Sequence, residues 1–322
     1  MSLPATPISD DQTRRALLIH NPGAGRKSVS ADDLIRMLKE AGYAPESRSP
    51  REVTAQDFAA ADADMALIVA AGGDGTVTQV VMEAPASARV GVIPLGTANN
   101  IANSLGIAGR PEEIIAGWAS ANIRTVDIWR ARGPWGERRF IEGCGVGALA
   151  RTSHHMDDHE IEGHSPEHEI SMARAMLAKV LTHSEPVPAK LVLDDSVLEG
   201  RFLLLEMLNF GAVGPRLPLA WSANPSDGLL EIGYTLDEHY NDFCEWLSDG
   251  ASPFTDAPVT LLRSRKIEVT WQNARFRIGD DYWPETGAPE PRAVHQATID
   301  LVASGPKILI PRQKAKREDW NS

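Results

Sequence analysis

The stretch Gly72-Gly73-Asp74-Gly75-Thr76 constrains most strongly how this chain can fold. An uninterrupted apolar run at 65–71 leads into it, and valines at helical spacing follow it. A short continuous apolar run is typical of a strand buried on both faces of a parallel sheet. A strand, a glycine-rich turn and a helix start together let bare backbone N–H groups approach a phosphate. The stretch therefore predicts an α/β unit with an anion-binding loop.

The carboxylate of Asp74 makes this loop unusual. It would repel a phosphate unless Mg²⁺ lies between them or the carboxylate takes a proton from a hydroxyl. That pairing favours phosphoryl transfer over simple anion binding. The alternative is a glycine turn that only closes a βα unit, with Asp74 as the helix N-cap. The spacing matches neither G-x-x-x-x-G-K-[ST] nor G-x-G-x-x-G, so the rest of the chain has to decide.

Two further loops of small and polar residues follow predicted buried strands. The first strand is 15–20 and precedes the turn 21–26, after which 30–41 reads as an amphipathic helix. Another strand at 90–95 precedes the polar loop 96–100. We expect the first strand, this helix and the strand at 65–71 to form one right-handed βαβ unit. All three loops would then lie at the carboxyl edge of one sheet, where open α/β sheets bind ligands.

Composition excludes several classes of function. The chain has 322 residues, a length typical of two domains, and a net charge of −12, which argues against binding driven by neutralisation of nucleic-acid phosphates. Its two cysteines, Cys144 and Cys244, are far apart and indicate neither a disulfide framework nor a cysteine metal site. No apolar stretch is long enough to span a membrane, and no signal peptide is recognisable. The prediction is a cytoplasmic protein without a transmembrane segment.

The second half of the chain changes character. Short alternating strands separated by turn signals are expected at 190–194, 197–207, 229–235, 265–270 and 274–278. This pattern is typical of an antiparallel β-sandwich rather than further βαβ units. The histidines between 154 and 168 are interleaved with acids, which favours a solvated loop over the alternative of a metal site. An amphipathic helix at 170–181 follows, with methionines whose more probable role is core packing.

Three motifs together resemble the diacylglycerol kinase catalytic-domain family, which includes bacterial lipid kinases and sphingosine kinases. They are Asn-Pro-x-Ala-Gly at 21–25, Gly-Gly-Asp-Gly-Thr at 72–76 and Pro-Leu-Gly-Thr-Ala-Asn-Asn at 94–100. The second motif is shared with NAD kinases and 6-phosphofructokinases. The resemblance implies an α/β nucleotide-binding lobe with a mostly parallel sheet at 14–128, completed by 305–315. It also implies a β-sandwich lipid-binding lobe at 129–304, with flexible tails at 1–13 and 316–322.

By this resemblance, the three loops bind ATP. The residues implied are Asn21, Pro22, Gly23, Ala24, Gly25, Gly73, Asp74, Gly75, Thr76, Val77, Thr78 and Thr97. Asp74 and Asp127 are implied to act with Mg²⁺ near the phosphates. A second, structural Mg²⁺ is implied at Asn224, Asp227 and Leu229, for which a plain turn is the alternative. The helix at 170–181 corresponds to one that lines the lipid pocket in the family.

The chain departs from the family pattern at three places. It has Gln79 where a Glu is usual and Asn100 where an Asp is frequent. At 276–283 it lacks the family's Asp-Gly-Glu, whose Glu acts as the base. The preferred alignment puts Asp281 at the Glu position, and a carboxylate one methylene shorter is still competent as a base. A shift by one residue would put Tyr282 there and leave no base.

The resulting prediction is an ATP-dependent lipid kinase with Asp281, Asp74 and Asp127 as catalytic residues. It would use ATP and Mg²⁺ and act on a diacylglycerol-like or sphingoid lipid presented at a membrane surface. Peripheral membrane attachment and a homodimer are left open. Two alternatives also stay open: a kinase of a soluble polyol or nucleotide, similar to NAD kinase, and a catalytically weak nucleotide- or lipid-binding protein.

Overall fold

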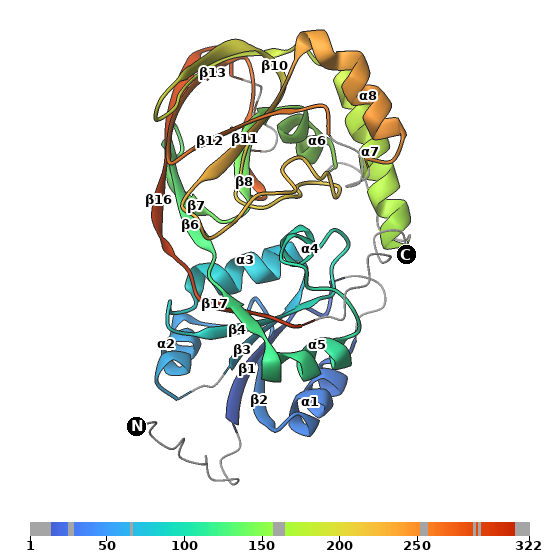
Figure 1. Cartoon of the computed structure of the whole chain (residues 1–322), viewed down its shortest axis with the longest axis vertical. Helices are drawn as coiled ribbons and strands as arrows, with labels where there is room; N and C mark the ends of the chain where they lie inside the picture. The colour runs from blue at the N-terminus through green and yellow to red at the C-terminus, as the bar shows by residue number, and fades with distance from the viewer. Residues whose placement is uncertain are drawn as a thin grey trace, which may run out of the picture.

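A computed structural model describes residues 14–24, 29–64, 67–156, 165–251, 257–285, 288 and 291–312, without the side chains of 61–64 and 153–156 (Figure 1). Gly25, the predicted tails at 1–13 and 316–322, and most of the histidine-rich stretch lie outside these residues. Figure 1 shows two lobes, one above the other, with the described residues up to Arg124 in the lower lobe.

The lower lobe is built on a six-stranded sheet with the order β2-β1-β3-β4-β17-β5. All neighbours are parallel except β17 and β5. Its strands are β1 (Arg14–His20), β2 (Tyr43–Arg48), β3 (Leu67–Gly72), β4 (Arg89–Pro94), β5 (Asn122–Arg124) and β17 (Lys307–Ile310). The continuous apolar sequences of β1, β3 and β4 form the centre of the sheet and are almost wholly buried.

Helices cover both faces of this sheet, so the lobe has three layers (Figure 1). They are α1 (Ala31–Glu40), α2 (Ala55–Asp64), α3 (Asp74–Glu83), α4 (Asn100–Ser104) and α5 (Pro111–Gly117). The sequence predicts one crossover between the strands now labelled β1 and β3. That prediction is wrong, because β2 and α2 lie between them and both β2 and β3 flank β1. The three predicted loops still follow the adjacent strands β1, β3 and β4.

The upper lobe is antiparallel throughout and has a sandwich-like form, as the sequence predicts. Its strands are β6 (Asp127–Gly133), β7 (Gly136–Phe140), β8 (Gly143–Gly147), β9 (Val187–Val192), β10 (Val197–Leu208), β11 (Leu230–Leu236), β12 (Thr260–Ser264), β13 (Lys266–Gln272), β14 (Phe276–Ile278), β15 (Asp281–Trp283) and β16 (Val294–Ser304). Helices α6 (Ala148–Met156), α7 (Pro166–His183) and α8 (Tyr240–Ser248) lie along one side of it (Figure 1).

The upper sheet curls until its two ends meet. β15 and β7 are the first and last strands of the path β15-β14-β8-β10-β9-β13-β16-β6-β7. The ring of Trp135, in the turn between β6 and β7, lies 5.0 Å from that of Phe276 on β14 and 6.2 Å from that of Trp283 on β15. An ion pair of 2.8 Å joins Arg138 on β7 to Asp281 on β15. Aromatic packing and this ion pair therefore close the sheet.

Two segments of chain cross between the lobes, one entering β6 and one leaving β16 (Figure 1). They run side by side, since Gly305 N–H donates to the Val126 carbonyl at 2.6 Å. The side chain of Asp127 is buried at this crossing and accepts from Gly228 N–H at 2.7 Å. Asn209 Nδ2 donates to the Asp127 carbonyl at 3.0 Å. The second crossing delivers β17 into the lower sheet between β4 and β5.

Candidate active site

A pocket of about 350 Å³ opens at the carboxyl ends of β1, β3 and β4. Its wall is made almost entirely by the loops that follow these strands, and it comprises Asn21, Gly23, Ala24, Pro50, Gly73, Gly75, Thr76, Gln79, Gly96 and Thr97. The N–H groups in the first turn of α3, at Asp74 and Gly75, have no acceptor within the helix and carry its positive dipole end. Backbone and small polar groups therefore line a space suited to an anion.

The loops are held together by close backbone approach. A Cβ atom added to Gly96 would lie 2.5 Å from the Gly73 Cα, so the loops after β3 and β4 touch through two glycines. Asn99 adopts a left-handed backbone with φ 50°. Its Oδ1 accepts from Gly96 N–H at 2.9 Å, which fixes the turn.

We expect Gly96→Ala to disturb this contact and raise the KM for a nucleotide. Overpacking typically costs about 1–3 kcal/mol, and about 1.4 kcal/mol corresponds to tenfold in binding. The KM should therefore rise about tenfold or more, measured by initial rates against nucleotide concentration. Gly233→Ala on β11 is the control, because an added Cβ would meet only Leu261 at an ordinary 3.5 Å. Equal KM values for both variants would contradict the expectation.

The side chain of Asp74 connects the loop after β3 to the loop after β4. Its carboxylate accepts from the N–H groups of Asn100 and Ile101, both at 2.9 Å, and so caps α4 from a different part of the chain. Burial raises its pKa, the two N–H bonds lower it, the charge of Asp280 raises it, and that of Arg216 lowers it. Asp74 therefore contributes both a helix cap and a negative charge. The sequence offers Asp74 as a possible N-cap of its own helix, α3, but in the structure it caps α4 instead.

Two carboxylates from the upper lobe face Asp74. Glu142, just before β8, is buried, and the hydroxyl of Thr78 donates to its Oε1 at 3.5 Å. Asp280, in the turn between β14 and β15, has its Oδ2 only 3.6 Å from the position of a Cβ added to Gly75. Burial and the charges of Asp74 and Asp280 raise the pKa of Glu142 well above its usual range. The side chain of Asp280 is exposed to solvent at the tip of its turn. Partial desolvation by the surrounding chain raises its pKa, and the charge of Arg277 opposes this rise. A cluster of three carboxylates thus spans the two lobes.

The raised pKa of Glu142 predicts how stability depends on pH. A carboxyl whose folded pKa lies above its unfolded value binds a proton more tightly in the folded state. Its stabilising contribution is full below the unfolded pKa of about 4.3 and is lost as pH rises through the folded pKa. Glu142→Gln cannot ionise, so its midpoint of thermal unfolding should exceed that of the ligand-free wild type by more at pH 8 than at pH 5. A difference independent of pH would contradict this.

The structure places Asp281 away from this cluster. Its side chain is 70% exposed and forms the ion pair with Arg138 that closes the curled sheet. The reason lies in the turn: Gly279 takes a left-handed backbone with φ 59°, so Asp280 and not Asp281 stands at the tip. The geometry does not support Asp281 as the predicted base. Neither of the two registers weighed from the sequence placed Asp280 there.

The structure also separates Asp127 from the loop pocket. Its N–H donates to the Pro225 carbonyl at 2.6 Å and its carboxylate accepts from Gly228 N–H at 2.7 Å, whereas the pocket is lined by the loops after β1, β3 and β4. Burial raises the pKa of Asp127 and the N–H of Gly228 lowers it. Asp127 therefore belongs to the crossing between the lobes, together with the predicted metal-binding turn at 224–229.

That turn is closed by its own hydrogen bonds. Asp227 Oδ1 accepts from Leu229 N–H at 3.0 Å, and Asn224 Oδ1 accepts from Ser226 N–H at 3.3 Å. An added Cβ on Gly228 would lie 3.3 Å from a guanidinium nitrogen of Arg265. Across the described parts of the chain, no group of three or more His, Cys, Asp or Glu side chains is arranged to hold a metal ion.

The remaining predicted nucleotide-binding residues differ in where they lie. Asn21, Gly23, Ala24, Gly73, Gly75, Thr76 and Thr97 line the pocket. Val77 is buried in the core of the lower lobe, Thr78 faces Glu142, and Pro22 is exposed beside the loop. Sequence reasoning missed Pro50 and Gly96 in the wall, and it missed Glu142. A lone acid between a buried strand end and the glycines of β8 is the signal that could have indicated Glu142.

Thr97 connects the pocket to the upper lobe. Its hydroxyl donates to Glu169 on α7 at 2.7 Å, and its carbonyl accepts from Arg216 Nη2 at 2.6 Å. Arg216 Nε donates to the Ala98 carbonyl at 3.0 Å. In turn, Arg174 on α7 donates to the Arg216 carbonyl at 2.8 Å. The loop after β4 is therefore held by α7 and by the turn at 214–216.

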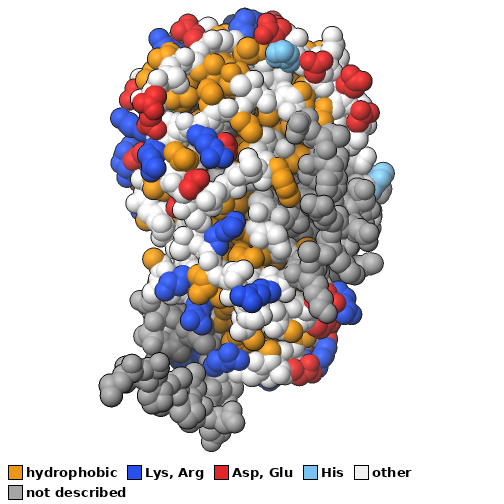
Figure 2. Space-filling model, viewed as in Figure 1, with side chains coloured by type: hydrophobic (Ala, Val, Ile, Leu, Met, Phe, Trp, Pro, Cys, Tyr) orange, Lys and Arg blue, Asp and Glu red, His pale blue; other side chains and the backbone are white. Residues whose placement is uncertain are grey.

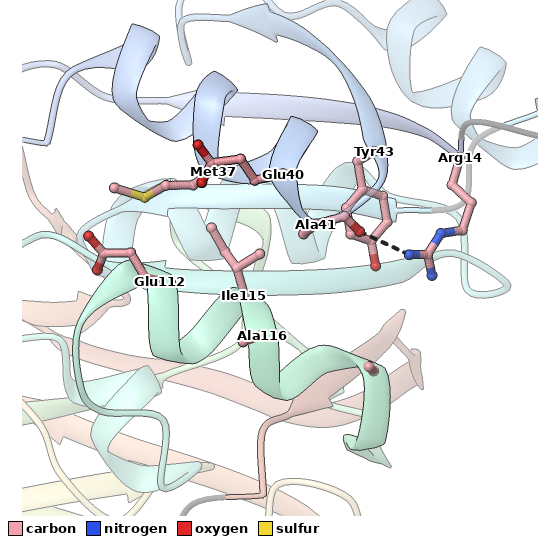
Figure 3. A pocket seen from close by; sticks show the side chains of 9 residues that line it. Arg14, Met37, Glu40, Ala41, Tyr43, Glu112, Ile115 and Ala116 are labelled. Carbon is pink, nitrogen blue, oxygen red and sulfur yellow. Dashed lines mark hydrogen bonds between the residues drawn. The ribbon is translucent and has the colours of Figure 1, made fainter.

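A second pocket of the same volume lies on the far side of the lower sheet, between α1 and α5 (Figure 3). Figure 3 shows Met37 and Ile115 beside the carboxylates of Glu40 and Glu112, with Arg14 bonded to the Ala41 carbonyl at 3.1 Å. These acids would repel an anion, and no glycine-rich loop reaches the pocket. The pocket at the strand ends is the candidate site.

Comparison with known proteins supports the choice of the pocket at the strand ends as the candidate site. Residues 15–131 match the model of the diacylglycerol kinase catalytic domain. All three strand-end loops lie in this domain, whereas Glu142 and Asp280 come from the part of the chain that follows it.

Relatives extend the similarity beyond that domain. The chain is 28% identical over 237 residues to a diacylglycerol kinase of Bacillus subtilis (strain 168), covering 68% of this chain and 73% of the relative. It is 31% identical over 207 residues to one from Staphylococcus epidermidis (strain RP62A), covering 59% and 60%. The chain thus spans three fifths to three quarters of these relatives. Their names agree with the enzyme class that the sequence predicts, a lipid kinase.

The fold is shared with solved structures. A crystal structure of a diacylglycerol kinase from Bacillus anthracis (strain Sterne) superposes with a TM-score of 0.62 at 16% identity. The superposition covers 94% of this chain and 98% of that one. Both lobes therefore belong to one known architecture, as the sequence predicts.

Proposed function

We propose that this chain is an ATP-dependent lipid kinase that phosphorylates a hydroxyl of a diacylglycerol-like or sphingoid lipid. The observation that carries the proposal is the pairing of an anion-suited pocket with acids from the facing lobe. The pocket has backbone-rich walls at three adjacent strand ends. Glu142 and Asp280 reach its edge from the upper lobe and act electrostatically on Asp74 or each other. Phosphoryl transfer depends on positioning and charge stabilisation, which this arrangement supplies.

The nucleotide would lie with its phosphates against the first turn of α3. Peptide N–H groups at Gly73 to Gly75 would donate to phosphate oxygens, as helix N-termini do. Thr97 and Asn21 would fix the rest of the nucleotide from the flanking loops. On the face in Figure 2, Lys and Arg side chains gather around the narrow part of the molecule and over the adjoining lower lobe. This local charge would favour approach of a triphosphate to a chain that is acidic overall.

Asp280 would act as the base in place of Asp281. The lipid oxygen forms a bond to the γ-phosphorus, the bond from that phosphorus to the β-phosphate oxygen breaks, and the hydroxyl proton passes to the Asp280 carboxylate. ADP leaves with the electron pair of the broken bond. A raised pKa suits this role, because a base works best when its pKa lies near the operating pH.

Mg²⁺ fits the carboxylates of Asp74 and Glu142. Both have a raised pKa in a site crowded with negative charge, and a cation would relieve their repulsion. In proteins Mg²⁺ typically takes one or two carboxylates and completes its shell with water and phosphate oxygens, so Asp74 and Glu142 would be enough to hold it beside a nucleotide. Bound there, it would neutralise charge on the phosphates.

We also propose a structural Mg²⁺ at Asn224, Asp227 and Leu229, where a carboxylate and two carbonyls are of the kind that Mg²⁺ binds. This turn rests on the buried Asp127 through Gly228 N–H. An ion there would stiffen the crossing between the lobes. A rise in the unfolding midpoint with Mg²⁺ that Asp227→Asn removes would support this site.

A lipid acceptor is favoured by the family whose catalytic-domain model residues 15–131 match. Helix α7 of the upper lobe is bonded to the nucleotide loop through Glu169. Two alternatives remain candidates. A kinase of a soluble polyol or nucleotide would phosphorylate a water-soluble acceptor, and a protein that only binds would transfer nothing.

The deciding experiment is transfer of ³²P from [γ-³²P]ATP to a panel of mixed micelles. The panel holds diacylglycerol, monoacylglycerol, ceramide and sphingosine, with NAD and glycerol as soluble acceptors. We expect a labelled lipid that requires Mg²⁺ and is absent without protein. Label on a soluble acceptor only would favour the first alternative. Nucleotide binding by calorimetry without transfer to any acceptor would overturn the kinase proposal.

A further inference from the structure

The ion pair between Arg277 on β14 and Glu206 on β10 is buried in the upper lobe and lies behind the carboxylate cluster. Arg277 Nη2 donates to Glu206 Oε2 at 2.6 Å, with side chains 7% and 0% exposed. The two residues flank Gly145, which pairs with Glu206 on one side of β8 and with Arg277 on the other. An added Cβ on Gly145 would lie 2.6 Å from the Glu206 carboxyl carbon. Only a glycine therefore leaves room for the pair to close across β8.

Arg277 also holds the turn that carries Asp280. Its Nη1 donates to the Gly279 carbonyl at 2.7 Å. The N–H of Gly279 donates to the Gly143 carbonyl at 2.9 Å. Both polar backbone groups of this left-handed residue are thus engaged, one by the guanidinium and one by β8. Asp280 follows directly, so its position against Gly75 depends on these two bonds.

The energetics of the pair point to a role in geometry rather than stability. Burying two charges carries a desolvation cost that their attraction offsets only when the remaining polar atoms are also bonded. Among the described residues, Glu206 Oε1 and Arg277 Nε are buried without a hydrogen-bond partner. Apolar residues of similar volume often replace such pairs without loss of stability. A planar guanidinium, however, can reach a carboxylate and a carbonyl at once in fixed directions.

We infer that Arg277, held by Glu206, is a positioning residue that fixes the Gly279–Asp280 turn at the edge of the nucleotide pocket. This inference rests on the proposed function, because Asp280 is the base proposed above. Arg277 does not touch the reacting atoms. It sets where the carboxylate of Asp280 stands relative to the lower lobe.

The test uses the full-length protein and two variants of the pair. Arg277→Met/Glu206→Leu removes both charges and keeps the apolar volume, and Arg277→Lys keeps the charge without the planar fork. For the double variant we expect kcat to fall about 10- to 100-fold, the range in which small misplacements of reacting groups act. The KM for ATP should stay within about threefold, because the wall of the pocket is unchanged. Arg277→Lys should recover only part of the kcat.

Hydrogen–deuterium exchange tests the inference without requiring kinase activity. The Gly279 amide should exchange with deuterium faster in the double variant, so the peptide covering 276–283 should exchange at least tenfold faster while one from β13 is unchanged. If wild type transfers no phosphate, the proposed function fails, and the exchange result still decides whether Arg277 anchors the turn. Unchanged exchange, or faster exchange with unchanged kcat, overturns the inference. If the double variant does not fold, kcat and the exchange of the 276–283 peptide are measured on Arg277→Lys instead, and these two results decide whether Arg277 positions the turn.

The matched control is the ion pair between Arg263 and Glu231, 2.5 Å apart, on β12 and β11. Glu231 is nearly as buried as Glu206, at 6% exposure, whereas Arg263 is 49% exposed, and the pair lies on β11 and β12 rather than beside the turn at 279–280. Arg263→Met/Glu231→Leu should change neither kcat nor exchange at 276–283. An equal fall of kcat in both double variants would show that losing any ion pair with a buried carboxylate suffices, and would overturn the positioning role.

Discussion

Replacing Asp280 by Asn is expected to lower kcat by about 10²- to 10⁴-fold, the contribution typical of a positioned general base. The amide keeps the size of the side chain but cannot accept the hydroxyl proton. The KM for ATP should change little, because Asp280 approaches Gly75 from the upper lobe and is not part of the pocket wall. Initial rates of lipid phosphorylation at saturating ATP measure the effect.

The neighbouring substitution Asp281→Asn is the matched control. It breaks an ion pair in which Asp281 is 70% exposed, and exposed pairs contribute only about 0–1 kcal/mol to stability. Activity should therefore stay close to that of wild type. The opposite result, with Asp281→Asn inactive and Asp280→Asn active, would restore the assignment made from the sequence. It would also mean that the turn at 279–281 rearranges when substrates bind.

Replacing Asp74 by Ala is expected to cause the second large loss. The variant removes a charge at the pocket edge, for which losses of about 10²- to 10³-fold are typical. It also leaves the N–H groups of Asn100 and Ile101 without their acceptor, so the loop after β4 would loosen. We expect kcat/KM for ATP to fall at least about 10²-fold and stability to fall by about 0.5–2 kcal/mol, as for other lost helix caps.

Ser30→Ala separates these two effects. Ser30 caps α1, and its hydroxyl oxygen accepts from Asp33 N–H at 3.1 Å. Its loss should cost a similar 0.5–2 kcal/mol or so without a change in kcat/KM, because Ser30 is not part of the pocket wall. Urea unfolding and initial rates on both variants provide the comparison. If Asp74→Ala loses stability but keeps its activity, Asp74 is only a cap.

The nucleotide lobe could be predicted largely from local sequence. β1, β3 and β4 are uninterrupted apolar runs that end in glycine-bearing or polar loops, and that combination has few other structural solutions. β2 could not be recognised, because Tyr-Ala-Pro-Glu-Ser-Arg neither alternates nor forms an apolar run. It is an edge strand with only one neighbour, so its sequence is weakly constrained. Missing it also hid the second crossover.

The carboxylate cluster could be predicted only in part. Asp74 lies inside a recognisable motif, whereas Glu142 and Asp280 come near it only through the packing of one lobe on the other. Which of two adjacent aspartates faces the pocket depends on a single left-handed glycine, Gly279, whose conformation the sequence does not reveal. For Asp127 the family resemblance implies a place near the phosphates, but its carboxylate bonds instead to the turn at 224–229.

The position of β17 has a consequence for how the protein is made. This strand lies inside the lower sheet, between β4 and β5, yet it is built from residues 307–310. During synthesis the ribosome must deliver the whole upper lobe and then residues 307–310 before β4 and β5 acquire the neighbour that separates them. A fragment ending at 131, where the match to the catalytic domain stops, would expose two unpaired strand edges and invite aggregation. Most residues of the nucleotide lobe are therefore synthesised early, but its sheet is complete only after residues 307–310 have been added.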